Sequence, residues 1–80
     1  MVIVGYTNSF KKSFKKIKNN SFSKKIKLQI KKIVSNPSIG KPMRYDRKGT
    51  RESYVSPYRI SYVYIKNKII FLSIYHKDEQ

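Results

Sequence analysis

The chain has 80 residues, with 19 Lys or Arg against four Asp or Glu and a formal net charge of +15. This length suits one domain over residues 1–80 and excludes two independent cores. Cysteine is absent and no apolar stretch reaches the roughly 18 residues of a membrane-crossing helix, so disulfides, thiolate chemistry and a transmembrane helix are excluded. No signal peptide is recognisable, and we expect a cytoplasmic protein without membrane association.

The first two expected elements are a strand and a helix. Residues 1–4 are apolar and predict a short strand, and residues 7–9 offer polar side chains that can cap a helix. The buried face of this helix is predicted by apolar residues at helical spacing, which are Phe10, Phe14 and Ile17.

A second helix is expected after the pair Asn19-Asn20, which ends the first. Ser21 or Ser23 can cap it, and Pro37 stops it. Its apolar face consists of Ile26, Ile30 and Ile33. Lysines cover the remaining surface of both helices, ten of them in a stretch that contains no acid. The sequence therefore predicts a helical hairpin with one apolar side and one cationic side.

The second half of the chain has the period of strands. Residues 38–50 are expected to be irregular, and residues 54–57 read as the end of a strand followed by a tight connection. Apolar side chains alternate over residues 58–65, and residues 66–68 predict a turn. Residues 69–75 are almost wholly apolar and predict a central strand. The predicted fold class is α+β in the order β-α-α-β-β-β, an antiparallel sheet with the helical hairpin on one face.

Most catalytic constellations lack their residues in this sequence. One histidine and four scattered acids do not make a metal site, so we expect no metal and no cofactor. Gly40-Lys41 lacks the rest of a phosphate loop, and a triad built on Ser73 and His76 has no nucleophile elbow. The positive charge favours a nucleic acid, an acidic protein or an anionic membrane as partner, although a lysine-rich proteome would also explain it. A membrane role is disfavoured because the core needs the apolar helix faces.

The residues that remain for chemistry are cations and tyrosines. This set suits cleavage of RNA, which carries its own nucleophile in the 2′-OH. A base takes the 2′-OH proton, cations stabilise the phosphorane and an acid protonates the leaving oxygen, without a metal. His76 is the only imidazole in the chain and is suited to proton transfer near neutral pH. Tyrosine rings can stack on unpaired bases.

Three motifs resemble the RelE/ParE family of bacterial and archaeal toxins. They are the stretch Gly49-Thr50-Arg51-Glu52-Ser53-Tyr54-Val55, the stretch Pro57-Tyr58-Arg59-Ile60-Ser61-Tyr62, and the apolar strand leading to His76-Lys77. The first strand, the helical hairpin and the chain length fit as well, so the resemblance covers essentially the whole chain. It implies an antiparallel sheet that holds the hairpin on one side. RelE-type members cleave mRNA in the ribosomal A site, ParE-type members inhibit DNA gyrase, and an antitoxin whose C-terminal segment wraps the toxin neutralises both.

The resemblance implies catalytic roles for four residues. Arg51 matches the basic residue that opens the first hairpin strand, and Arg59 matches the arginine that holds the scissile phosphate. His76 and Lys77 match a segment in which members carry a basic residue or a histidine that acts as acid or base. The candidates for stacking on bases are Tyr58, Tyr75 and Tyr54. The candidates for contacting ribosomal RNA or an acidic antitoxin are Lys11, Lys15, Lys24, Lys27 and Lys31.

The leading hypothesis is a metal-independent endoribonuclease toxin that cleaves mRNA at the ribosome and inhibits translation. Its expected partners are a cognate acidic antitoxin, mRNA and the ribosome, and the toxin alone is expected to be a monomer. Two alternatives are a ParE-like DNA gyrase inhibitor without nuclease activity and an inactive member that only binds its antitoxin. Both are favoured because a second basic residue of RelE falls at Ser53 and the C-terminal tyrosine of RelE has no counterpart here.

These roles also have structural alternatives. Arg59 could form an ion pair with Glu52 or Asp46, in place of a phosphate contact. His76 could be a surface residue, and the helical lysines could be an ordinary solvated face.

Overall fold

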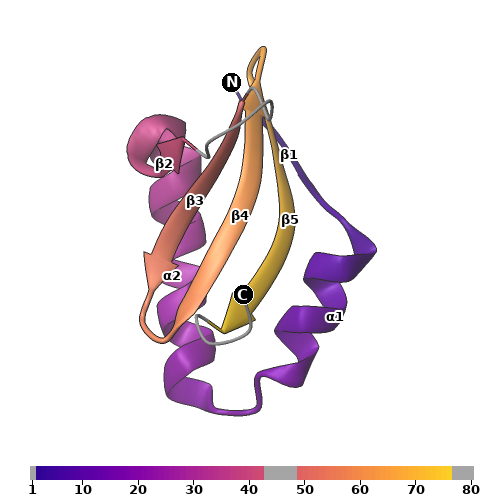
Figure 1. Cartoon of the computed structure of the whole chain (residues 1–80), viewed down its shortest axis with the longest axis vertical. Coiled ribbons are helices and arrows are strands. Elements are labelled where there is room, and N and C mark those ends of the chain that lie inside the picture. Colours follow the sequence, from indigo (N-terminus) through magenta and orange to yellow (C-terminus); the bar gives the residue numbers. More distant parts are fainter. Residues whose placement is uncertain (1, 43–48, 77–80) are drawn as a thin grey trace.

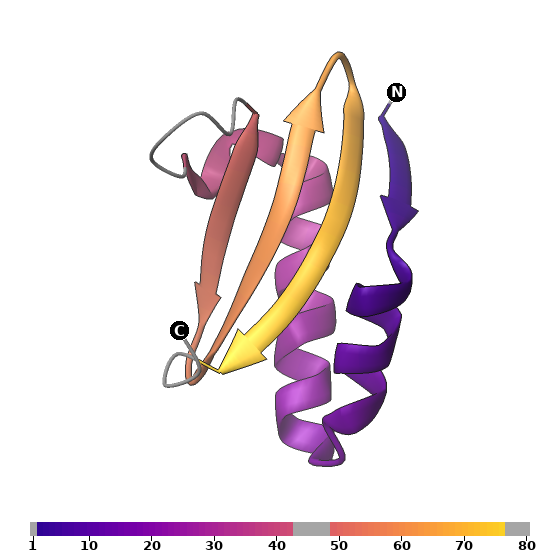
Figure 2. The same ribbon diagram turned by 45° about the vertical axis from the view of Figure 1, so that its right-hand side comes forward.

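The computed structural model describes residues 2–42 and 49–76. The elements, in chain order, are β1 (Ile3–Tyr6), α1 (Asn8–Lys16), α2 (Asn20–Ser35), the short 3-10 helix η1 (Pro37–Ile39), β2 (Lys41–Pro42), β3 (Thr50–Val55), β4 (Tyr58–Ile65) and β5 (Lys68–His76). The strands form one sheet in the order β1-β5-β4-β3-β2, and both helices lie on one face of it (Figures 1 and 2). The predicted α+β class and the predicted order of elements are confirmed.

One strand pairing differs from the antiparallel sheet that the sequence predicts. β2, β3, β4 and β5 pair antiparallel in sequence order, but β1 lies parallel to β5, with Ile3 opposite Lys68 and Tyr6 opposite Phe71. The two helices separate β1 from the later strands along the chain, so they allow β1 to join the sheet in the parallel direction. β5 is therefore flanked by strands on both sides, in agreement with its nearly unbroken apolar sequence.

The caps of the two helices follow from side-chain hydrogen bonds near their first residues. Thr7 caps α1 as predicted, because its Oγ1 accepts from the amide of Phe10 and donates to the carbonyl of Leu72 in β5. The cap of α2 is Asn19, whose Oδ1 accepts from the amides of Ser21 and Phe22. The expected cap at Ser21 or Ser23 was wrong, since Asn19 satisfies the first free amides of α2.

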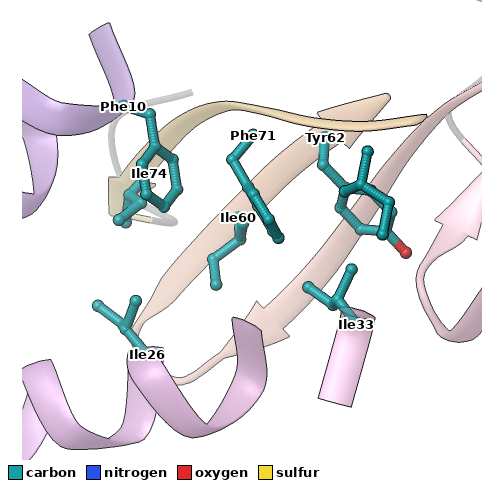
Figure 3. Close-up of a cluster of buried hydrophobic side chains, with 8 residues drawn as sticks. Phe10, Ile26, Ile33, Ile60, Tyr62, Phe71 and Ile74 are labelled. Atoms are coloured by element: carbon teal, nitrogen blue, oxygen red, sulfur yellow. The ribbon is translucent and has the colours of Figure 1, made fainter. Parts of the chain in front are cut away.

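The core lies between the helices and the sheet. Ile26 and Ile33 of α2 point toward β4 and β5, whose buried members include Ile60, Tyr62 and Phe71 (Figure 3). Ile30, Phe14 and Ile17, which the helical period also predicts, pack at its margin. The alternation seen in the sequence of β4 therefore separates a face that packs on the helices from a face that does not.

The segment that the sequence left irregular contains η1 and β2. The hydroxyl of Tyr62, which is fully buried, donates to the carbonyl of Pro37 and accepts from the amide of Gly40. A side chain at position 40 has no room, because its Cβ would lie 2.5 Å from the Tyr62 hydroxyl. Burial raises the pKa of Tyr62, while the amide of Gly40 and the charge of Arg51 act in the opposite direction.

The turn predicted at residues 66–68 is present between β4 and β5. Lys66 and Asn67 have φ values of 50° and 64°, the left-handed conformation of a tight hairpin turn. Gly49, whose φ is 79°, accepts a backbone hydrogen bond from Tyr64. Within residues 2–42 and 49–76, neither helix is long and apolar enough to cross a membrane.

Candidate functional site

Arg59 lies on the face of the sheet opposite to the helices. It neighbours the buried Ile60 in β4, and successive strand residues point to opposite faces. Its guanidinium donates to Glu52 over 3.1 Å, with 32% of the arginine side chain and 22% of the glutamate side chain exposed. The other oxygen of Glu52 accepts a hydrogen bond from Tyr75 across the sheet, and the guanidinium also lies 5.8 Å from the centre of the Tyr54 ring. Arg59 is therefore held by an acid and a ring of its own sheet.

Arg51 points to the helix side of the sheet. It shares that face with Ser53, whose hydroxyl accepts a hydrogen bond of 2.7 Å from Gln29 in α2. The Arg51 guanidinium donates to the carbonyls of Ser38 and Gly40, over 3.1 Å and 2.7 Å. Arg51 therefore holds the segment that contains η1 against β3, which is a structural role.

His76 is on the helix side as well, at the other end of the sheet. It pairs with Tyr58, and the two rings meet edge to face with their centres 5.6 Å apart. Tyr58 makes a second edge contact with Phe22 of α2 at the same distance. His76 lines a polar groove of about 270 Å³ together with Tyr58 and with Lys16 of α1.

The structure does not bring the predicted catalytic residues together. Arg59 is on one face of the sheet, and Arg51 and His76 are on the other. Arg51 stands opposite Tyr62 and His76 opposite Tyr58, four positions apart along β4, which is about 13 Å at the usual strand rise. Lys77 lies outside the described residues. The described residues therefore do not form one cluster of Arg51, Arg59 and His76 on a single face of the sheet.

The three stacking candidates also divide between the faces. Tyr54 and Tyr75 flank Arg59 on the face of the sheet away from the helices, here called the open face. Tyr58 packs between Phe22 and His76 on the helix side. Tyr54 is about half exposed. A cavity of about 570 Å³ runs past the Arg59 and Glu52 pair to the outer edge of β3, where Gln29 and Gly40 also line it. This cavity is the surface on which a ligand could meet the open-face residues.

The candidate lysines occupy exposed positions on the two helices. Four of the five line a single apolar groove between α1 and α2, namely Lys11, Lys15, Lys27 and Lys31. The fifth, Lys24, does not. The sequence predicted these lysines as a cationic face, but it gave no sign that they border an opening.

Two features of the site were missed from the sequence. One is this groove, which lies between α1 and α2 and is lined by residues of both helices. The other is the pair of hydrogen bonds that Glu52 accepts, one from Arg59 and one from Tyr75. The sequence indicated Glu52 only as one possible ion-pair partner of Arg59. No group of three or more metal-ligating side chains occurs in residues 2–42 and 49–76.

Comparison with known proteins places the chain in a family. Residues 4–80 match the family of the ParE toxin of the type II toxin–antitoxin system parDE. A comparison with curated protein sequences gave no match.

Solved structures with the same fold include three toxins or toxin complexes. The isolated RelE toxin of E. coli superposes with a TM-score of 0.80 at 15% identity, over 95% of this chain and 84% of RelE. A chain of the E. coli DinJ–YafQ complex gives 0.82 at 16% identity, over 99% of this chain and 97% of that one. A chain of the RelB–RelE antitoxin–toxin complex from Methanococcus jannaschii gives 0.77 at 21% identity, over 94% and 92%. The family match over nearly the whole sequence carries the assignment, and the chain belongs to the ParE toxin family of type II toxin–antitoxin systems.

Proposed function

We propose that this toxin inhibits its target by binding it, without cleaving RNA, and that the target is DNA gyrase. The proposal departs from the ribonuclease hypothesis and follows its gyrase alternative. The observation that carries it is that Arg59 and Tyr75, two of the residues proposed to act on RNA, both donate hydrogen bonds to the carboxylate of Glu52. The match to the ParE toxin family supports the same direction.

Ribonuclease chemistry is disfavoured by the arrangement of charge. Cleavage through the 2′-OH needs cations at the phosphorane and proton donors and acceptors within about 3 Å of the reacting oxygens. On the open face, the Glu52 carboxylate lies beside Arg59, the one arginine that the described residues place there, and would repel a phosphate. On the helix side, Arg51 is bound to backbone carbonyls and is separated from His76 along the sheet.

The partner that controls the toxin is proposed to be a cognate acidic antitoxin. The RelB–RelE and DinJ–YafQ structures are toxin–antitoxin complexes of the same fold, which supports this partner. A net charge of +15 favours an acidic protein, because opposite charges steer association and fix its orientation.

The test is a supercoiling assay with purified gyrase, relaxed plasmid and the full-length toxin. We expect the toxin to inhibit supercoiling, and the variants Arg51→Lys and His76→Ala to inhibit it as well wherever they remain folded. In cells, induction should stop growth and damage DNA while mRNA stays intact. Unimpaired supercoiling with excess toxin, together with growth arrest, would contradict the proposal.

Ribonuclease activity remains a second candidate because of one observation on the helix side. The groove beside His76 gathers an imidazole, the Tyr58 hydroxyl and the Lys16 ammonium, which are groups suited to proton transfer and phosphate binding. Mapping of mRNA 5′ ends after induction tests it. Cuts in phase with codons that vanish in His76→Ala would support ribonuclease activity at this groove and would displace the gyrase proposal.

A further inference from the structure

The open face of the sheet is apolar at the end where β1 begins and β4 turns into β5 (Figure 2). Ile3 lies between two valines that pack on the core, and Ile70 lies between two fully buried residues of β5. Successive strand residues point to opposite faces, so both isoleucines point away from the helices. Val63 and Ile65 do the same, because they flank Tyr64, which packs against the core. The set Ile3, Val63, Ile65 and Ile70 is here called the apolar patch.

The register of the strands brings the members of the apolar patch together. Ile3 and Ile65 both pair with Lys68, which lies between them in one row across the sheet. Ile70 pairs with Val63 in the next row. The exposed fractions of Ile3, Ile65 and Ile70 are 63%, 44% and 39%. Apolar patches with a polar rim are typical of surfaces that bind another molecule.

A glycine in β1 leaves one side of Ile70 uncovered. Gly5 pairs with Ile70, and a Cβ at position 5 would lie 4.0 Å from the Cγ1 of Ile70, which is ordinary van der Waals contact. The φ of Gly5 is outside the left-handed region, so the backbone would accept another residue here. Neither space nor backbone conformation requires this glycine, and its effect is that Ile70 stays open to a partner.

Two lysines border the apolar patch without a neutralising acid. Lys68 lies within its first row and Lys66 in the adjoining turn, and both are exposed. Within residues 2–42 and 49–76 the one acid is Glu52, whose carboxylate is already bound by two other side chains. The two lysines, together with patch members of β4 and β5, line a hollow of about 260 Å³. The patch therefore combines an apolar surface, a positive rim and a hollow.

We propose that the apolar patch is the surface by which the toxin binds gyrase. The surface it meets on the enzyme should be acidic and should project an apolar side chain into the hollow. This inference rests on the proposed function, in which gyrase is the target. Carboxylates fit the lysines, because opposite charges steer association and fix its orientation. An apolar anchor fits the hollow, since side chains buried in such pockets carry much of the binding energy of an interface.

Other occupants would use only some of these features. A second copy of the chain would bring Lys66 and Lys68 against like charges, with a net charge of +15 on each protein. A phosphate backbone would use the lysines and leave the isoleucines in contact with water. A lipid surface would use lysines and isoleucines but does not need a hollow. An acidic protein surface with an apolar projection uses all three.

The first comparison removes apolar side chains from the full-length toxin. The test pair is Ile3→Thr with Ile70→Thr, because threonine keeps the strand preference of a β-branched residue. The control pair is Leu28→Gln with Ile39→Thr, which removes exposed apolar side chains from α2 and η1, away from the patch. Both pairs are assayed with purified gyrase and relaxed plasmid.

The second comparison reverses charge. The test pair is Lys66→Glu with Lys68→Glu, and the control pair is Lys24→Glu with Lys32→Glu, which makes the same change on exposed residues of α2. In concentrated salt the effect of the lysine test pair should shrink, whereas the effect of the isoleucine test pair should persist.

We expect each test pair to raise the toxin concentration that half-inhibits supercoiling at least about tenfold, and each control pair to raise it less than about threefold. Gly5→Thr should also weaken inhibition without lowering Tm, because it covers Ile70 and removes no side chain of the patch. This variant decides the matter if a test pair does not fold. Circular dichroism and thermal unfolding establish that each variant is folded.

Three results would overturn the inference. Equal losses in test and control pairs would indicate diffuse attraction, and unchanged inhibition in Gly5→Thr and in both test pairs would place the gyrase contact elsewhere. Binding of the parent to vesicles of phosphatidylglycerol and phosphatidylethanolamine, lost in the isoleucine pair while gyrase inhibition is unchanged, would assign the patch to a membrane. These results leave the proposed function standing, whereas a parent toxin that does not inhibit supercoiling would defeat both proposals.

Discussion

Replacing Glu52 with glutamine tests whether this carboxylate is the acceptor that holds the open face together. Glutamine keeps the shape and one oxygen acceptor, but it removes the charge that Arg59 and Tyr75 both contact. Hydrogen bonds to charged groups are worth about 1.5–3 kcal/mol and neutral ones about 0.5–1.5 kcal/mol. Because Arg59 and Glu52 are 32% and 22% exposed, solvent screens part of the difference.

We therefore expect Glu52→Gln to lower the free energy of unfolding by about 1–2 kcal/mol. In a domain of this size that corresponds to a fall in Tm of about 5–15 °C. Urea unfolding followed by circular dichroism gives the free energy, and the m-value should not change, since the same surface is buried. In concentrated salt the difference should shrink, because ions screen the pair.

A double-mutant cycle with Tyr75→Phe separates this bond from a general effect of net charge. If Glu52 acts through its contacts, part of the cost disappears when the tyrosine hydroxyl is already absent. An identical cost in both backgrounds would refute the assigned bond to Tyr75. A Glu52→Gln protein as stable as the parent would refute the claim that Glu52 stabilises the fold through Arg59 and Tyr75.

Three further predictions concern the two hydrogen bonds by which the Tyr62 hydroxyl holds Pro37 and Gly40, at the two ends of η1. Tyr62→Phe removes a buried hydroxyl with two partners, so the free energy of unfolding should fall by about 2–3 kcal/mol in urea titrations. The control Tyr64→Phe, on the same strand, should lower it by less than about 0.5 kcal/mol. Equal losses would contradict the role assigned to the Tyr62 hydroxyl. Because burial raises the pKa of Tyr62 in the folded chain, its contribution to the free energy of unfolding is fully present below a pH of about 10 and is lost as pH rises through the raised value. Above a pH of about 10, the free energy of unfolding should therefore fall less steeply with pH in Tyr62→Phe than in the parent. Parallel pH profiles of the two proteins would refute this. Gly40→Ala brings a Cβ to 2.5 Å from the Tyr62 hydroxyl, so thermal unfolding should show a loss of at least about 1 kcal/mol, and an unchanged Tm would show that the segment moves freely.

The helices and the central strands follow from the period of their apolar residues. Helical spacing puts Phe10 on the apolar face of α1, and Ile26 and Ile33 on the apolar face of α2, so all three are buried. Strand spacing puts Ile60 and Tyr62 on the same face of β4, and both are buried. Such patterns depend only on neighbours in the chain. The parallel pairing of β1 with β5 depends on residues more than sixty positions apart, and no local pattern specifies it.

The candidate site was harder to predict, for a reason that the hairpin makes clear. The tight connection at Ser56-Pro57 puts Val55 opposite Tyr58, which in turn puts Arg51 opposite Tyr62 and Arg59 opposite Tyr54. This register places the two arginines on opposite faces, and it could have been worked out from the two-residue connection. The groove between the helices could not, because it depends on how far apart α1 and α2 settle on the sheet.

The ion pair of Arg59 shows how a motif can mislead when only one of its residues is considered. Arginine beside a tyrosine in a strand suits a phosphate, and the sequence offered Glu52 or Asp46 as the alternative. In the folded chain Glu52 is the partner, and it also accepts from Tyr75, which had been a stacking candidate. Arg59 and Tyr75, two of the residues that suggested a nucleotide site, therefore both bind the carboxylate of Glu52.

The most direct measurement of the central claim is RNA cleavage by the purified toxin on ribosomes that carry a defined mRNA. The account predicts that the mRNA stays at its full length, no more degraded than in a reaction without toxin, even with toxin in excess of ribosomes. Cleavage of that mRNA by the parent protein, lost in a folded His76→Ala or Arg59→Ala variant, would contradict it.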